Sequence, residues 1–136
     1  METLAVQAPQ EESRTPETLA FEVARWADQL KAEDIHVFHV NDYCSYADYV
    51  VVCNGNSSVH VQAITEAIRV NAKKSGSPPL SLEGAREGQW VLIDFGDVLA
   101  HVFFSPVREY YELDRMWPDS CMVPVPFLQQ ENSALV

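Results

Sequence analysis

Residues 90–117, WVLIDFGDVLAHVFFSPVREYYELDRMW, decide the fold of this chain. They contain two apolar runs, residues 90–95 and 98–104, separated by Gly96-Asp97. Glycine tolerates a positive φ, so two strand-like runs with this spacer predict an antiparallel β-hairpin. In a regular strand Trp90, Leu92 and Asp94 share one face, and the apolar residues between them share the other. The hairpin is therefore expected to supply much of the core.

The residues that follow the hairpin predict an amphipathic helix. Ser105 suits the N-cap and Pro106 the first helical position, where its missing donor costs nothing. Three large side chains then recur along one helical face, and Pro118 ends the pattern. They are Tyr110, Leu113 and Trp117.

Upstream of the hairpin, the sequence predicts two helices and three strands. Thr15 and Pro16 begin a helix that reaches about Leu30, and a second helix follows the capping residues at 54–58 and ends before Gly76. The strands are expected at residues 35–40, 49–53 and about 80–82. Residues 49–53, YVVVC, are continuously apolar, which is typical of a central strand covered on both faces.

These elements predict one α/β (α+β) domain in the order α-β-β-α-β-β-β-α. Its mixed sheet has about five strands and carries helices on both faces. The domain is expected over residues 15–117, after a polar, disordered tail at residues 1–14. Residues 118–136 contain several prolines and are expected to be a flexible tail, in which Met122-Val123 and Phe127-Leu128 could dock onto the domain.

The charge of the chain limits the kind of partner it can bind. Nine Lys and Arg residues stand against 20 Asp and Glu residues, so the formal net charge is −11. A bare phosphate backbone would be repelled, and little direct nucleic-acid contact is expected. A basic protein would be attracted by the same field.

Three features bear on the compartment. No apolar run approaches the roughly 20 residues that cross a bilayer, so no membrane association is expected. Cys44, Cys53 and Cys121 are odd in number and lack a C-x-x-C spacing, which favours a reducing compartment, and no function is assigned to them. The N-terminus is acidic and resembles neither a signal peptide nor a transit peptide, so a bacterial cytoplasm is favoured and an organelle stays open.

The residues that could suggest an enzyme each have a simpler explanation. Asp94 and Asp97 could hold Mg²⁺ while the helix start at residues 55–58 holds a phosphate, as nucleotidyl or phosphoryl transfer requires. However, Asp is also a common turn residue, Asn and Ser are common helix caps, and no cationic clamp lies near these motifs. The triplet Asp94-Phe95-Gly96 matches a kinase motif without its companions.

No metal or cofactor is expected. The histidines lack ligand spacing, although strand pairing is expected to bring His101 near Asp94. These histidines are His36, His39, His60 and His101.

The aromatic residues of the 90–117 stretch exceed what a hairpin and a short helix can bury, and Tyr and Trp are enriched at binding hot spots. Trp90 is as well placed for a partner surface as for the core.

Several motifs together resemble the ribosome silencing factor family, also called the Iojap family. They are DYVVVCNGNSSVHVQAI at residues 48–64, Glu83-Gly84, WVLIDFGDVLAHVF, and REYYELDRMW, which ends at Trp117. The resemblance covers about residues 16–117. It implies a fold similar to that of nucleotidyltransferases but without their catalytic set.

The resemblance also implies a function. Members of this family bind the large ribosomal subunit through its basic protein uL-fourteen and block joining of the small subunit, which represses translation when nutrients are short. On this basis we expect no enzymatic activity and no cofactor, with Mg²⁺-dependent nucleotidyl or phosphoryl transfer by Asp94 and Asp97 as the alternative. The oligomeric state is left open, with a homodimer of the free protein as one option.

The family's partner surface, carried onto this chain, predicts the contact residues. Trp90 is expected to be an apolar anchor, and Asp94 and Asp97 are expected to pair with Lys or Arg. Glu83 and His101 should lie nearby, and Tyr110 and Tyr111 are further candidates.

Overall fold

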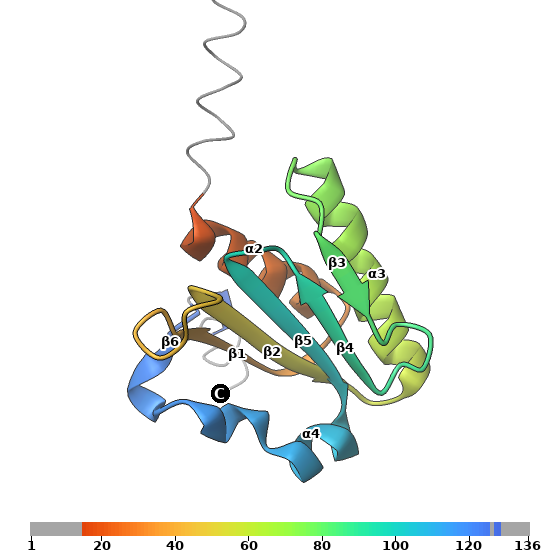
Figure 1. The fold of residues 1–136 in the computed structure, drawn as a ribbon. Helices are drawn as coiled ribbons and strands as arrows, with labels where there is room; N and C mark the ends of the chain where they lie inside the picture. The colour runs from red at the N-terminus through yellow and green to blue at the C-terminus, as the bar shows by residue number, and fades with distance from the viewer. Residues whose placement is uncertain (1–14, 126, 129–136) are drawn as a thin grey trace, which may run out of the picture.

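A computed structural model describes residues 15–125 and 127–128 of the chain (Figure 1). Its strands are β1 (Glu33–His39), β2 (Tyr49–Gly55), β3 (Ser81–Glu83), β4 (Trp90–Asp94), β5 (Val98–Phe104) and β6 (Met122–Val123). They form one sheet in the order β3-β4-β5-β2-β1-β6, in which β2 and β5 are parallel and the other pairs are antiparallel. The α+β fold class and the mixed sheet are confirmed.

The helices α2 (Pro16–Gln29) and α3 (Ser58–Lys74) begin and end at the residues whose chemistry favours those positions. The Thr15 hydroxyl accepts the backbone N–H of Thr18, and the Ser57 hydroxyl accepts that of His60. Gly76 follows the C-cap of α3 at a φ of 92°, a conformation that costs little without a Cβ. Both predicted helices are therefore confirmed, together with their caps.

The sheet separates two apolar clusters. α2 and α3 pack side by side against the first face of the sheet, where alternate residues of β1, β2, β4 and β5 are buried (Figure 1). The second cluster is smaller and lies on the other face, over β1 and β2, where it includes Phe38, Val50 and Val52. Every residue of β2 is buried, which confirms the prediction of a central strand covered on both sides.

The predicted hairpin is also confirmed. β4 pairs with β5 in antiparallel register from Trp90 opposite Phe103 to Asp94 opposite Leu99. Gly96 adopts a φ of 95° in the turn. Trp90, Leu92 and Asp94 are partly exposed on the second face, while Val91 and Ile93 are fully buried on the first. The alternation expected from the sequence is therefore observed.

The prediction of one continuous helix over residues 105–117 is wrong. α4 (Ser105–Tyr111) ends after two turns because Glu112 adopts a left-handed conformation with a φ of 51°. Two 3₁₀ helices follow, η1 (Leu113–Met116) and η2 (Asp119–Cys121). Trp117 is therefore buried in the second cluster rather than aligned with Tyr110, which is 80% exposed.

The predicted N-cap of this helix is wrong as well. Phe104 occupies the cap position and makes no side-chain cap hydrogen bond. The Ser105 hydroxyl instead donates to the carbonyl of Gly55 at 3.0 Å and accepts from the amide of Asn54 at 2.8 Å. Ser105 therefore links the start of α4 to the end of β2.

The C-terminal region contributes more to the sheet than expected. β6, a sixth strand in place of the five or so predicted, pairs with β1, with Val37 opposite Val123 and Phe38 opposite Met122. The docking anticipated for Met122-Val123 is thus observed. The domain boundaries themselves stay a prediction, and the tail residues 1–14, 126 and 129–136 lie outside the described residues.

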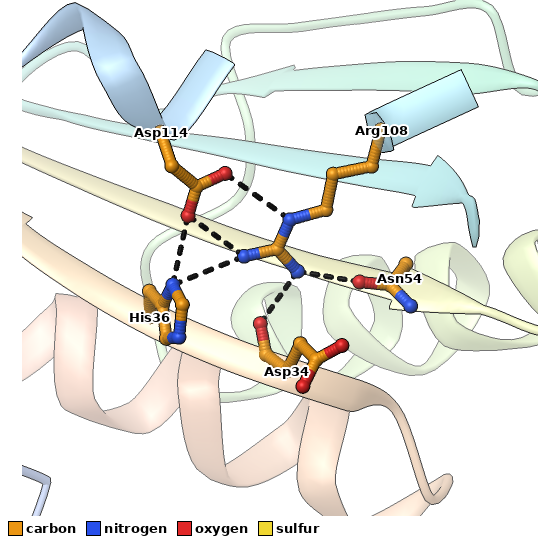
Figure 2. A network of polar contacts seen from close by, with 5 residues as sticks. All are labelled: Asp34, His36, Asn54, Arg108 and Asp114. Carbon is orange, nitrogen blue, oxygen red and sulfur yellow. Dashed lines mark hydrogen bonds and ion pairs between the residues drawn. The ribbon is translucent and has the colours of Figure 1, made fainter. Parts of the chain in front are cut away.

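We refer to α4, η1 and η2 (residues 105–121) as the C-terminal arm. Arg108 fastens it to the sheet (Figure 2). Its Nε and Nη2 donate to Asp114 at 3.1 and 2.8 Å, and Nη1 donates to the carbonyl of Asp34 at 2.6 Å and to the side-chain oxygen of Asn54. Nη2 also lies 3.1 Å from Nδ1 of His36. Four of the five N–H groups of the guanidinium therefore donate to Asp114, Asn54 and the Asp34 carbonyl.

Asp114 is the anionic member of this network. Burial alone would raise its pKa, but hydrogen bonds from His36 and Arg108, together with the guanidinium charge, outweigh the burial and hold the Asp114 pKa well below its usual range. The side chain of Arg108 is only 10% exposed, so the loss of its counter-charge would leave a buried cation unpaired. The network therefore favours the attached position of the C-terminal arm.

We expect Asp114→Asn to lower the free energy of unfolding at pH 7 by about 2 kcal/mol, because it leaves Arg108 without its counter-charge. The folded-state pKa of Asp114 is depressed, so its stabilising contribution is complete above the unfolded-state pKa of about 4 and is lost as the pH falls below it. The difference in the free energy of unfolding between wild type and variant should therefore be about 1 kcal/mol smaller at pH 3 than at pH 7. Urea denaturation at pH 7, 5 and 3 measures this difference.

Asp42→Asn is the matched control, because Asp42 is exposed and lies outside the network. It should change the stability by less than about 0.5 kcal/mol at each pH. A gap between wild type and Asp114→Asn that stays constant down to pH 3 would contradict this role of Asp114.

Candidate functional site

The second face of the sheet is covered over β1 and β2 but partly open over β3, β4 and β5. Glu83 lies opposite Leu92, and Leu92 lies opposite His101, so the three form one row across the strands. Side chains directly opposite in antiparallel strands lie on the same face, roughly 5 Å apart. With their neighbours on this face they form what we call the uncovered face: Glu83, Trp90, Leu92, Asp94, Leu99 and His101.

Trp90 lies where the uncovered face meets the C-terminal arm. Its indole packs on Phe103 and on Tyr111 of α4, with a centroid distance of 4.9 Å to each ring. Tyr110 packs edge-on against Tyr111 at the same distance. Tyr111 is 55% exposed and Tyr110 80% exposed, so the aromatic surface continues from the sheet onto α4.

His101 is held in one tautomer by Trp90. The indole Nε1–H of Trp90 donates to Nδ1 of His101 at 3.0 Å, and an indole nitrogen can only donate. Nδ1 therefore carries no proton, and the ring proton is on Nε2. Burial lowers the pKa of His101 to about 4, so the imidazole is neutral at physiological pH.

The loop before β4 positions Trp90. Gly84 has a φ of 86°, and a Cβ at this position would lie 2.2 Å from the carbonyl oxygen of Trp90. The amide of Gln62 on α3 donates to the carbonyls of Ala85 and Arg86 at 3.1 and 2.8 Å. The Glu83-Gly84 motif is therefore explained by a close backbone approach that only glycine allows.

The two predicted acidic contacts lie at the far end of the hairpin from Trp90. The Asp94 carboxylate accepts the backbone N–H of Gly96 at 2.7 Å and so stabilises the turn. Asp97 is exposed, and its carbonyl accepts the backbone N–H groups of Asp48 and Tyr49. Glu83, Trp90, Asp94 and His101 thus share one face, whereas Asp97 occupies the turn itself.

The structure does not assemble the enzymatic constellation considered from the sequence. Asp94 pairs with Leu99, which in turn pairs with Val50 at the start of β2. The loop at residues 55–58 follows the other end of that strand. Five residues of strand separate the two positions, which corresponds to roughly 17 Å. Asp94 and Asp97 therefore cannot act together with this loop on one phosphate group.

The loop at residues 55–58 is also occupied by the protein itself. The backbone N–H of Asn56 donates to Nδ1 of His60 at 3.0 Å, and Nε2 of His60 contacts the carbonyl of Leu30 at 2.7 Å. Arg108, a cation at this end of the sheet, is already bound to Asp114, Asn54 and the carbonyl of Asp34. Within residues 15–125 and 127–128, no group of three His, Cys, Asp or Glu residues could hold a metal ion.

Two kinds of functional residue were missed from the sequence. Leu99 joins the uncovered face, and its place there follows only from the register of β4 and β5. Arg108 and Asp114 fix the arm that carries Tyr111, but their partners on β1 and β2 are 54 to 78 positions away in the chain. No local sequence pattern predicts such contacts.

In the part of the chain that the structure describes, no helix is both long and apolar enough to cross a membrane.

We expect the His101 ring to titrate with a midpoint near 4, because burial disfavours its charged form. Its folded-state pKa lies below the unfolded value of about 6.5, so the associated stability is complete above that value and is lost as the pH falls toward 4. Nitrogen-15 NMR of the imidazole measures both midpoint and tautomer, with His101→Gln identifying the signal. A midpoint above 6, or a proton on Nδ1, would contradict the hydrogen bond from Trp90.

Comparisons with known proteins agree on one family. A family model described as "Ribosomal silencing factor during starvation" matches residues 12–135. The chain is 39% identical over 100 residues to the ribosomal silencing factor RsfS of Bacillus subtilis, which covers 74% of this chain and 85% of the relative. It is 30% identical over 118 residues to the chloroplast protein Iojap of Arabidopsis thaliana, covering 85% of this chain and 49% of that protein.

Solved structures are similar over most of their length. A protein from Chromobacterium violaceum superimposes with a TM-score of 0.69 at 30% identity, covering 81% of this chain and 92% of the other. A protein from Bacillus halodurans superimposes with a TM-score of 0.67 at 36% identity, covering 76% and 94%. The chain therefore belongs to the ribosomal silencing factor family, RsfS/Iojap.

Proposed function

We propose that this protein binds the large ribosomal subunit through the basic ribosomal protein uL-fourteen and blocks joining of the small subunit, which represses translation. The observation that carries this proposal is the aromatic and acidic composition of the uncovered face and the adjoining part of α4. Membership of the ribosomal silencing factor family supports action on the ribosome. The identity of the partner protein and the steric mechanism go beyond family membership and are part of the proposal.

The uncovered face has the components of a protein-binding surface. Trp90, Tyr110 and Tyr111 form a continuous aromatic chain that solvent reaches. Aromatic side chains dominate binding energy at interfaces because they bury a large apolar area with few rotatable bonds. Glu83 lies beside Trp90, and Asp94 and Asp97 add carboxylates at the far end of the same hairpin, which favours a basic partner over an acidic one.

The net charge of −11 favours a protein contact over an RNA contact on the ribosome. RNA presents a dense array of phosphates, and this chain would approach it against repulsion. A basic ribosomal protein offers charges of the opposite sign within the same particle. Attraction to that protein would speed the encounter and orient the aromatic residues toward it.

A steric block requires no reacting group, and we propose that the protein acts without catalysis. The bound protein would occupy the surface that the small subunit needs. We further propose that it acts in a bacterial cytoplasm. When it is not bound to the ribosome, the protein has the homodimer as an alternative to the monomer.

Trp90→Ala is expected to weaken binding to purified large subunits by about 2 kcal/mol or more, because it removes a central aromatic anchor. Tyr111→Ala should cost about 1 kcal/mol, because it removes the ring that packs against that anchor. Sedimentation with large subunits measures binding, and light scattering after addition of small subunits measures joining. Both variants should restore joining in proportion to their loss of binding.

Tyr46→Ala is the matched control for Tyr111→Ala, because Tyr46 is 60% exposed and Tyr111 is 55% exposed. Tyr46 lies in the loop between β1 and β2, outside the uncovered face, and its loss should leave binding unchanged. Circular dichroism checks the fold of each variant. Wild-type binding by folded Trp90→Ala and Tyr111→Ala proteins would rule out this surface.

Asp97→Lys should slow association with the large subunit severalfold at low salt, because it reverses a charge that faces a basic surface. The difference from wild type should shrink as ionic strength rises. Glu66→Lys is the matched control, since it makes the same charge change at an exposed position of α3, which covers the first face of the sheet. Stopped-flow association rates over a salt series measure both variants, and equal slowing by the two would indicate only an effect of net charge.

A further inference from the structure

The row Glu83, Leu92, His101 borders a pocket in the uncovered face. Trp90 and Gly84 complete its lining, and its volume is about 310 Å³. We propose that this pocket receives one long cationic side chain, Lys or Arg, of the partner, with the aliphatic stem on Leu92 and Trp90 and the charged head at Glu83. The identity of the partner rests on the proposed function, whereas the chemistry of the pocket does not.

The strand register sets the order of groups along the pocket. Glu83 is on the edge strand β3, Leu92 is on β4, and His101 is on β5. The pocket therefore has a carboxylate at its outer end, an apolar floor and an imidazole at its inner end. A long Lys or Arg side chain has the matching order, because its stem is apolar and its tip is charged.

The carboxylate at the outer end is available. Glu83 is exposed, and it makes no side-chain hydrogen bond or ion pair with the residues of the chain that the structure describes. An incoming cation therefore meets no competing partner at this carboxylate, and it gains modestly from the pair because water screens exposed charges.

The imidazole at the inner end is compatible with a cation. The hydrogen bond from Trp90 leaves Nδ1 of His101 without a proton, and its burial keeps the ring neutral. A charged imidazole would repel an incoming cation, whereas this one does not. Nε2–H has no acceptor among the described residues and is suited to donate to a backbone carbonyl beside the inserted side chain.

Other occupants fit the pocket less well. An anionic side chain would meet the Glu83 carboxylate. An apolar side chain would cover the carboxylate and the His101 N–H without offering either a partner, which costs desolvation free energy. The pocket therefore selects for charge as well as for length.

The first test measures binding of the full-length protein to purified large subunits. Glu83→Gln removes the charge and keeps the shape, and it should weaken binding about fivefold. Glu87→Gln is the matched control, because Glu87 is an exposed carboxylate of the following loop that does not line the pocket. It should weaken binding less than about twofold. Equal effects of the two substitutions would overturn the proposal.

The second test does not depend on the ribosome. We expect n-butylguanidinium at millimolar concentration to shift the Trp90 indole N–H signal in NMR spectra, and the uncharged isostere n-butylurea to shift it far less. Trp90→Phe identifies the signal. Glu83→Gln should abolish the difference between the two probes, and Glu87→Gln should preserve it. Equal shifts from both probes in the wild-type protein would overturn the pocket assignment.

The two tests separate the two proposals. If the wild-type protein does not bind large subunits but distinguishes n-butylguanidinium from n-butylurea, the proposed function fails and the cation pocket stands. If the protein binds large subunits in a Trp90-dependent way but Glu83→Gln behaves like Glu87→Gln, the proposed function stands and the cation pocket fails.

Discussion

The central strand β2 is buried along its whole length, and the rest of the architecture follows from this constraint. A strand that is apolar on both sides requires a cover on each face of the sheet. α2 and α3 cover the first face, and the C-terminal arm covers β1 and β2 on the second. The arm is short, so the second face remains open over β3, β4 and β5. The candidate binding surface consists of this open part of the sheet and the adjoining rings of α4.

The arm stays in place because a charged network crosses from it to the sheet. Arg108 and Asp114 come from the arm, whereas His36, Asn54 and the carbonyl of Asp34 come from β1 and β2 (Figure 2). A buried ion pair adds little net stability relative to apolar packing, but it is costly to break on one side. The network therefore acts mainly to specify where the arm lies. Because Tyr111 is on that arm, the same network sets the position of one ring of the candidate site.

The elements predicted correctly from the sequence are those with local signals. The caps of α2 and α3, the turn at Gly96-Asp97 and the apolar run of β2 each depend on residues that are neighbours in the chain. The break at Glu112 was missed because residues 105–117 have helical periodicity throughout. Tertiary contacts override that pattern: Trp117 is buried beside Phe38 at a centroid distance of 5.2 Å, and Asp114 is bound to Arg108. The row Glu83, Leu92, His101 was likewise out of reach, because it requires the register of three strands.

The aspartates of the hairpin show why a motif needs its geometry before it suggests chemistry. Asp94 and a helix start with capping residues are features that a phosphate-transfer site would use, and both are present. The parallel pairing of β2 and β5 places them at opposite ends of the sheet, and Asp94 accepts the hydrogen bond that stabilises its own turn. The antiparallel register of β3, β4 and β5 places Glu83, Leu92 and His101 in one row, where a carboxylate, an apolar floor and a neutral imidazole complement a cationic side chain. The acidic character of this face is thus better matched to recognition of a basic protein than to catalysis on a phosphate.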